Sequence, residues 1–191
     1  MKIIRILAIS TVLLMLCTAN QALASGAVKL GVDFNGDHDA SANGQSVSTD
    51  VDTGISLTGE LFTDIDDHFD LGGGIQYQMP RSLKGYSSDE FNFVPIYGMV
   101  RVKSTSPNVA PYAIAQIGYN FFLSNSSYKS SSYGDAELEG GLYYGIGGGL
   151  LIKKHFIVEL LYSKDYGKAK FPPGSIDIEY SKFTLNIGYN F

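Results

Sequence analysis

The chain has 191 residues and carries 14 Lys and Arg against 19 Asp and Glu, a formal net charge of −5 at pH 7. This acidic balance argues against a nucleic-acid partner, because binding nucleic acid requires a basic patch. Beyond the N-terminus no apolar run approaches the roughly 20 residues that a membrane-spanning helix needs, which excludes a helical membrane protein. The length fits a single domain.

The first 24 residues have the pattern of a secretory signal peptide. Lys2 and Arg5 form a basic start, residues 6–16 are almost entirely apolar, and Ala22 and Ala24 supply the small residues that a signal peptidase reads. We therefore expect residues 1–24 to be cleaved, leaving residues 25–191 as one β-barrel domain.

The single cysteine, Cys17, lies inside this predicted signal. Leu16 precedes it where a lipoprotein signal has a small residue, so a lipid anchor is not expected. The processed chain would have no thiol for a disulfide or a metal. Loss of Lys2 and Arg5 leaves 12 basic and 19 acidic residues, a net charge of −7.

Six segments of the processed chain alternate between apolar and polar residues with the period of a β-strand. In chain order their apolar sets are Val28, Leu30, Val32 and Phe34; Val51, Thr53, Ile55, Leu57 and Leu61; Phe69, Leu71, Ile75, Tyr77 and Met79; Leu142, Tyr144, Ile146, Leu150 and Ile152; Phe156, Val158, Leu160 and Tyr162; and Phe183, Leu185, Ile187, Tyr189 and Phe191.

Two more segments, 91–103 and 111–122, read as strands of less certain phase. Pro95 cannot donate to a strand ladder, so we expect a bulge there. Above the bulge Phe91 and Phe93 would face outward, and below it Ile96, Val100 and Val102. In the second segment the outward set is Ala113, Ala115, Ile117, Tyr119 and Phe121, although the apolar Ile114 falls on the other face.

The connections alternate in length. Segments 36–50, 80–90, 123–138 and 166–177 are long and polar, whereas 63–68, 104–110 and 153–155 are short. This layout is typical of outer-membrane barrels. The sequence therefore predicts an all-β fold, an eight-stranded antiparallel up-and-down transmembrane β-barrel with long outer loops, short periplasmic turns and both termini in the periplasm.

The strands of a soluble barrel such as a lipocalin also alternate between apolar and polar residues. Other features must therefore decide whether the apolar face lies inside the barrel or meets lipid. Eight strands leave an interior just wide enough for side chains, which suits the Gly-rich polar set. Aromatic residues fall near the strand ends, as in the girdles that flank the apolar band of a membrane barrel. They are Phe34, Phe69, Tyr77, Phe121, Phe156, Tyr162, Phe183 and Tyr189.

Charged residues should then occupy the lumen. A base facing lipid at mid-bilayer costs roughly 2–4 kcal/mol, and an acid somewhat less. The same phases place a set of charged residues together in the periplasmic half of the lumen: Lys29, Glu60, Asp70, Arg101 and Glu159. Buried charges must be paired, so we predict a structural ion-pair network in which Lys29 and Arg101 serve the carboxylates. The alternative is a gated path for protons or ions.

The final strand ends on an aromatic residue. Phe191 is preceded at every second position by Tyr189, Ile187, Leu185 and Phe183, which resembles the assembly signal of outer-membrane barrels. With the loop layout, the processed chain resembles the small OmpA/OmpX-type barrel family. This resemblance implies an outer-membrane location, contact with membrane lipid and lipopolysaccharide, and recognition by the barrel assembly machinery. We expect a monomer.

Two enzyme types share this barrel shape. Lipid A deacylases use a His and a Ser two residues apart near the rim, but the comparable Ser163 has no histidine beside it and would be a poor nucleophile. The lipid A palmitoyltransferase type uses His, Asp and Ser on outer loops. His38, Ser87, Ser88 and Asp89 supply these residues, yet no N-terminal amphipathic helix fits between Ala24 and Val28.

The remaining features have simpler interpretations. His68 and His155 should face water in turns, the glycines of 145–149 should make room in the lumen, and no cofactor or metal is expected. An alternative for the acids Asp37, Asp39, Asp50 and Asp52 is to hold calcium or to bridge cations to lipopolysaccharide, but their spacing fits no EF-hand-type loop. Segment 124–135 mixes Ser, Tyr and Gly, which suits a contact surface or a solvated loop.

The sequence favours a non-enzymatic structural or adhesin-like barrel with a possible extracellular ligand; a lipid A acyltransferase and a narrow channel are the alternatives.

Overall fold

A computed structural model describes residues 25–42, 45–79, 81–83, 86–124, 129–130, 134–135, 137–171 and 174–191. The strands are β1 (Ser25–Ala42), β2 (Gln45–Val51), β3 (Gly54–Asp64), β4 (Phe69–Gln78), β5 (Arg81–Leu83), β6 (Tyr86–Lys103), β7 (Val109–Ser124), β8 (Lys129–Ser130), β9 (Gly134–Asp135), β10 (Glu137–Ile152), β11 (Phe156–Phe171) and β12 (Gly174–Asn190). In this part of the chain no helix is long and apolar enough to cross a membrane.

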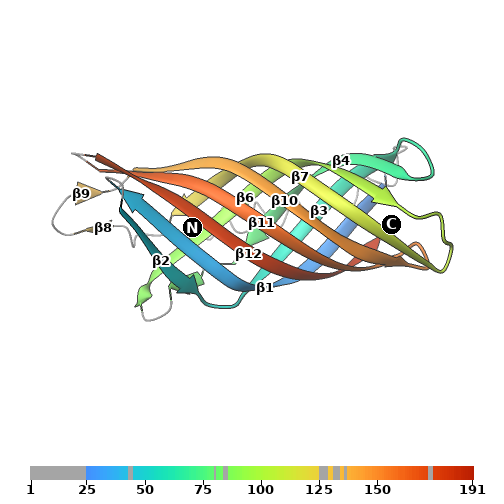
Figure 1. Ribbon diagram of the computed structural model, residues 1–191, viewed down its shortest axis with the longest axis horizontal. Helices are drawn as coiled ribbons and strands as arrows, with labels where there is room; N and C mark the ends of the chain where they lie inside the picture. The colour runs from blue at the N-terminus through green and yellow to red at the C-terminus, as the bar shows by residue number, and fades with distance from the viewer. Residues whose placement is uncertain are drawn as a thin grey trace.

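The strands form a closed barrel (Figure 1). Around the wall the order is β1, β3, β4, β6, β7, β10, β11 and β12, each antiparallel to its neighbours, and β12 returns to pair with β1. Short breaks separate β2 from β3 and β5 from β4, so each of these pairs traces one long strand. The predicted eight-stranded antiparallel barrel is confirmed.

The closing seam joins the first and last strands. Its ladder runs from Ala27 opposite Asn190 to Ser41 opposite Asp177, with one bulge between Phe34 and Asp37. On β12 the odd-numbered residues from Phe183 to Tyr189 are exposed, and Lys182, Thr184 and Asn186 are buried. The predicted phase of this strand is confirmed.

Apolar side chains cover the outside of the barrel. Ile187 is 66% exposed, Ile117 65% and Ile146 63%, fractions expected of a surface that meets lipid instead of water. On β7, Ala113, Ile117 and Phe121 face outward while Ile114 is buried, which confirms the predicted phase of segment 111–122. Ile114 therefore packs inside despite its apolar character.

The predicted bulge at Pro95 is wrong. The ladder between β6 and β7 continues from Phe91 to Lys103 without a shift, and Phe93 is fully buried in the lumen instead of facing outward. Pro95 is tolerated for another reason. Among the described residues, β6 pairs with β4 only up to Ile96 and with β5 only from Phe91. Pro95 lies in this gap, where the missing N–H breaks no ladder bond on that side.

Val51 was also assigned to the wrong face. It is only 4% exposed, because the strand is interrupted at Asp52 and Thr53 and the alternation restarts at β3. Val51 instead packs inside the barrel in one buried cluster with Phe93 and Tyr180.

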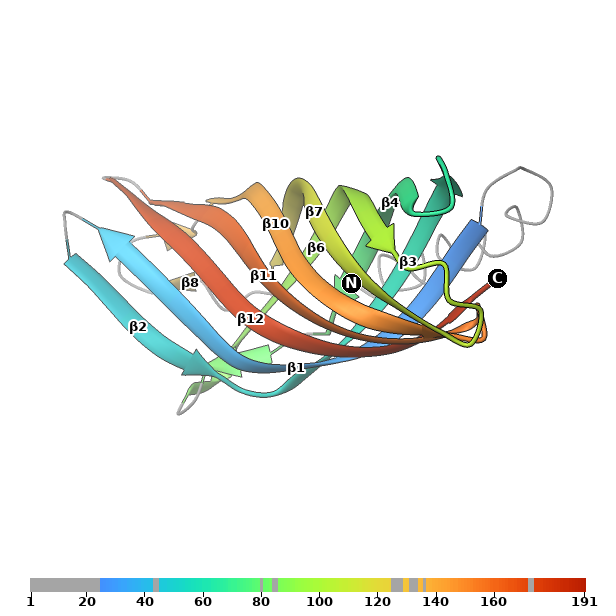
Figure 2. The same ribbon diagram turned by 45° about the vertical axis from the view of Figure 1, so that its right-hand side comes forward.

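The two ends of the barrel differ. At one end the turns are short: residues 65–68, 104–108 and 153–155. Both ends of the described chain meet there, where Gly26 and Phe191 exchange backbone hydrogen bonds of 3.0 and 2.8 Å. At the other end β1, β2, β11 and β12 run well past the apolar band (Figure 2).

Segments 36–50 and 166–177 are thus largely antiparallel ladder, where irregular loops were predicted. The reason is chemical. Above the apolar band the outward residues include Asp37, Lys168 and Asp177, all exposed, because this surface meets water. Where the outer face of a strand meets water, its outward residues are polar. Such a strand lacks the alternation of apolar and polar residues that predicted the other strands.

Candidate functional site

The lumen is filled by side chains from all eight wall strands, and glycines provide the space. A Cβ at Gly149 would lie 2.7 Å from the ring of Tyr112, and one at Gly74 would lie 2.8 Å from the ring of Tyr97. Bulky tyrosines can therefore cross the interior. This matches the interpretation of the glycines in 145–149 as a source of room in the lumen.

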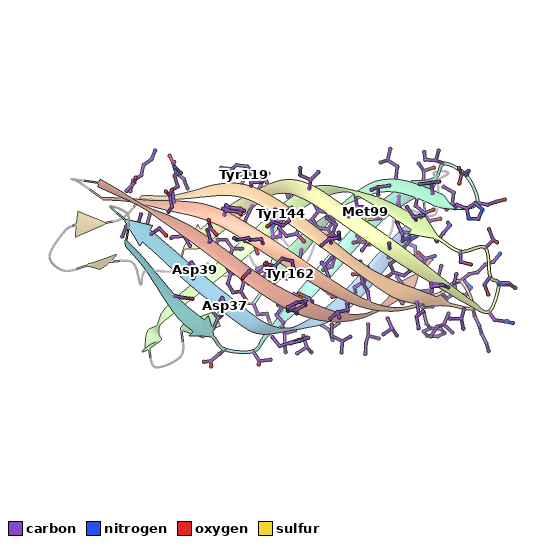
Figure 3. All side chains as sticks on the ribbon, viewed as in Figure 1. Asp37, Asp39, Met99, Tyr119, Tyr144 and Tyr162 are labelled. Atoms are coloured by element: carbon purple, nitrogen blue, oxygen red, sulfur yellow. The ribbon has the colours of Figure 1, made fainter. Side chains whose placement is uncertain are left out.

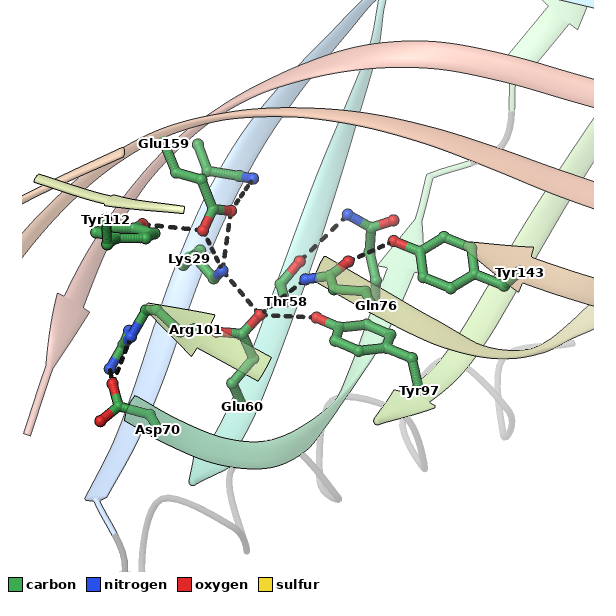
Figure 4. A network of polar contacts seen from close by, with 12 residues as sticks. Lys29, Thr58, Glu60, Asp70, Gln76, Tyr97, Arg101, Tyr112, Tyr143 and Glu159 are labelled. Atoms are coloured by element: carbon green, nitrogen blue, oxygen red, sulfur yellow. Dashed lines mark hydrogen bonds and ion pairs between the residues drawn. The ribbon is translucent and has the colours of Figure 1, made fainter. Parts of the chain in front are cut away.

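The middle of the lumen is organised around one ammonium group (Figure 4). Lys29 Nζ lies 2.8 Å from Glu60 Oε1 and 2.9 Å from Glu159 Oε1. Tyrosine hydroxyls complete the shell: Tyr97 donates to Glu60 and Tyr112 donates to Glu159, each at 2.9 Å. Two carboxylates therefore share one base, and neutral donors stabilise the remaining charge.

A second charged group lies nearer the short turns. Arg101 donates to Asp70 Oδ2 from Nε at 2.7 Å and pairs with the same oxygen through Nη2 at 2.6 Å. The guanidinium also lies 4.2 Å from the ring centroid of Phe62, a favourable cation–π distance. Lys103 bridges Asp70 and Asp64 at 2.6 and 2.5 Å, so the acids and bases of this group balance.

A third group lies toward the opposite end. Asp33 accepts hydrogen bonds from Ser56 and Thr184, and Lys182 Nζ lies 3.3 Å from it. Asp165, also fully buried, accepts a hydrogen bond of 3.4 Å from Gln78. These residues were not predicted as part of the network, although the alternation along β1 and β12 predicts that Asp33 and Lys182 face the lumen.

The structure places all five residues of the predicted network in the lumen, each at most 2% exposed. It distributes them over two groups. Lys29 joins Glu60 and Glu159, whereas Arg101 joins Asp70. Apolar layers lie beyond them, with Phe62 and Leu151 toward the short turns and Phe93 and Tyr180 toward the other end.

Few groups are available for catalysis among the described residues. Ser163 is fully buried, out of reach of a lipid acyl chain at the rim. His68 and His155 are exposed in the turns, as predicted, and their Nδ1 atoms lie 3.2 and 3.1 Å from the backbone oxygens of Lys103 and Asn190. The described residues contain no cluster of His, Cys, Asp or Glu that could hold a metal ion.

The other residues predicted to act in the loops lie outside the described side chains. The side chains of Phe91, His38, Ser87, Ser88, Asp89 and Asp50 are not among those described, nor is most of segment 124–135. The predicted acyltransferase residues therefore lie outside the described side chains, and that prediction stays untested.

The strands beyond the apolar band form a charged outer sheet, defined here as residues 37–42 of β1, β2, residues 137–141 of β10, residues 164–171 of β11 and residues 174–181 of β12 (Figure 3). Its lysines are paired across strands: Lys164 with Glu179 at 2.5 Å, Lys168 with Asp177 at 3.1 Å and Lys170 with Glu139 at 2.6 Å. The hydrogen bond that Lys164 donates to the carboxylate of Glu179 raises the pKa of Lys164 above its ordinary value.

The comparisons with known proteins agree with this architecture. The model of the outer membrane protein beta-barrel domain family matches residues 8–191. The chain belongs to this family. Membership in the family, together with the apolar outer band, locates the protein in the outer membrane. No curated protein matches the chain.

Several solved barrels share the fold. Ail, the attachment invasion locus protein of Yersinia pestis, is 15% identical, with 89% of this chain and 100% of that chain covered and a TM-score of 0.51. OprG from Pseudomonas aeruginosa is 14% identical, with 88% and 94% covered and a TM-score of 0.52. Neisserial surface protein A is 17% identical, with 88% and 99% covered and a TM-score of 0.52. Identities this low show a common fold alone.

Proposed function

We propose that this protein is a non-enzymatic outer-membrane barrel that presents its charged outer sheet as an adhesin-like surface for an extracellular ligand. The observation that carries the proposal is the contrast between the lumen and the outer sheet. The lumen charges are paired with one another and buried, whereas the outer sheet holds exposed charged side chains well beyond the apolar band.

Among the described residues, β2 is an edge strand of the outer sheet. β2 pairs with β1 along its whole length, from Val51 to Gln45. On its other side the described residues provide only one pair, Val51 with Leu83. Unpaired backbone groups of an edge strand can accept another chain, which supports a role in protein contact.

The proposed orientation follows from the two ends. We infer that the short turns and both termini face the periplasm, after removal of residues 1–24, and that the outer sheet faces the exterior beside lipopolysaccharide. In the same proposal Phe183, Leu185, Ile187, Tyr189 and Phe191 are read by the barrel assembly machinery, and the barrel works as a monomer.

Surface labelling tests the orientation. Outside the predicted signal the chain has no cysteine, so single cysteines can be introduced. A membrane-impermeant maleimide should label Asp177→Cys on intact cells and should label Asp67→Cys only after the outer membrane is permeabilised. Labelling of Asp67→Cys on intact cells would reverse the proposed orientation.

Shortening the outer sheet tests the function. Replacing residues 38–49 with a tight turn should abolish adhesion of expressing cells to epithelial monolayers, while the heat-dependent gel shift of a folded barrel remains. Full adhesion by the shortened, folded protein would contradict the proposal. Altered lipid A in mass spectra upon expression would favour the acyltransferase that uses His38, and stable conductance in planar bilayers would favour the channel.

A further inference from the structure

The short-turn end of the barrel contains a cavity of about 720 Å³ that opens to solvent. The C-terminal end of the chain, which lies at the right-hand side of Figure 1, is part of its lining. The three short turns form its wall together with the two ends of the described chain, Ser25 and Phe191. We call this cavity the mouth. It lies at the far end of the barrel from the outer sheet and has no part in the function proposed above.

The floor of the mouth is apolar. Phe62, Ala110 and Leu151 line it, and each is less than a tenth exposed. Arg101 also reaches the floor, but its guanidinium is held by Asp70 and stacked on Phe62. These apolar side chains lie at the bottom of the cavity, where an apolar group of a ligand would contact them.

The rim carries opposite charges on opposite sides. In the circular strand order, the connection between β3 and β4 lies half a turn around the barrel from the connection between β10 and β11. The first supplies Asp66 and Asp67, and the second supplies Lys154. Hydroxyl groups of Ser104, Thr105 and Ser106 lie on the arc between them.

Structural contacts already occupy some of these charges. Asp64 pairs with Lys103. Asp66 Oδ1 accepts hydrogen bonds from the backbone N–H groups of His68 and Phe69, at 2.7 and 2.9 Å, which fixes the turn. Asp67 and Lys154 are both exposed, and neither takes part in the structural contacts named above, so both can meet a ligand.

We propose that the mouth binds a short peptide with a free amino group and a free carboxylate. The amino group lies on the Asp67 side, the carboxylate on the Lys154 side, and an apolar side chain on the floor. The volume falls within the range of roughly 300–1,000 Å³ that is usual for ligand pockets. A fatty acid would leave the acidic side without a partner, and a nucleotide would bring excess negative charge to it.

The ligand chemistry can be tested by titration. The probe is alanyl-leucyl-alanine, added to the barrel in lipid nanodiscs and followed by amide shifts in NMR spectra. The N-acetylated and C-amidated forms serve as matched probes. Shifts should be confined to the three short turns, and each blocked peptide should bind about two- to fivefold more weakly, the range of one exposed ion pair. Equal affinity for all three peptides, or no shift, would overturn the proposal.

Variants assign the two ends of the peptide. Asp67→Asn should weaken binding of the free peptide and leave the N-acetylated form unaffected, because that form has no amino charge to lose. Lys154→Gln should weaken binding of the free peptide and leave the C-amidated form unaffected, because that form has no carboxylate charge to lose. The matched controls, Asp177→Asn and Lys168→Gln in the outer sheet, should leave every affinity unchanged. The assignment would be contradicted if both control variants lost affinity, or if both mouth variants kept it. Neither result depends on adhesion by the outer sheet.

Discussion

The two halves of the barrel wall are built differently. From β10 through β11 and β12 to β1 the ladders are long, with a single bulge in each of two seams. From β2 to β6 the strands are broken at Asp52 and Thr53, and the pairing of β4 with β6 stops at Ile96. The regular half supplies most of the outer sheet, to which the broken half contributes β2, whereas buried aromatic residues line the lumen in both halves. Continuity of pairing therefore accompanies the strands that run furthest beyond the apolar band.

The largest expected effect comes from removing the base at the centre of the lumen. Lys29→Met leaves Glu60 and Glu159 buried without their shared cation, which should cost about 3–5 kcal/mol of folding free energy. Guanidinium unfolding in detergent micelles measures this loss. The triple variant that adds Glu60→Gln and Glu159→Gln should recover much of it. If Lys29→Met unfolds at the wild-type midpoint, the regular half does not depend on this ion pair.

Deleting Phe191 should act on assembly of the closing seam. The deletion removes the backbone hydrogen bonds to Gly26 and the aromatic end of the proposed assembly signal. We expect the processed chain to accumulate in the periplasm, with export across the inner membrane intact, as measured by fractionation and by the boiling-dependent gel shift. Normal amounts of folded protein in the outer membrane would refute the role assigned to this residue.

A smaller effect is expected from crowding the lumen. Gly149→Ala would press a methyl group against Tyr112 and against the backbone oxygen of Val158, and should cost about 1–3 kcal/mol. Gly98→Ala is the matched control, because the nearest atom to its Cβ is 3.8 Å away. Unfolding midpoints of the two variants give the comparison. A cost at Gly98 equal to that at Gly149 would show that strand propensity, and not the lumen, sets the penalty.

The smallest effect should come from Pro95. Pro95→Ala restores an N–H in the gap between β4 and β6 and removes the restraint that the ring places on the unfolded chain, so the free energy of unfolding should fall by about 1 kcal/mol or less. Amide exchange should be faster at Val94 than at Leu185 in the closing seam. A strong stabilisation by Pro95→Ala would mean that the proline breaks a ladder bond, and the two halves of the wall would then differ less than described.

The same division explains what the sequence could predict. On β12 alternation continues without interruption, and Phe183 to Tyr189 were assigned to the correct face. In the broken half, Val51 was misassigned because residue type does not reveal the interruption at Asp52 and Thr53. Phe93 was misassigned because Pro95 predicted a bulge, whereas the ladder with β7 continues through it. Alternation placed the five predicted charges inside the barrel. Their division into two groups depends on which side chains reach across the interior, and spacing along a strand does not encode this.

The joined ends of the chain also bear on protein engineering. Because Gly26 and Phe191 are hydrogen-bonded to each other at the short-turn end, any sequence fused to either terminus is carried beside the mouth. An epitope inserted between β1 and β2 is instead carried at the tip of a two-stranded arm at the opposite end. The barrel is therefore a two-sided display scaffold, in which the choice of insertion point, and not the length of a linker, decides on which face of the membrane a passenger is presented.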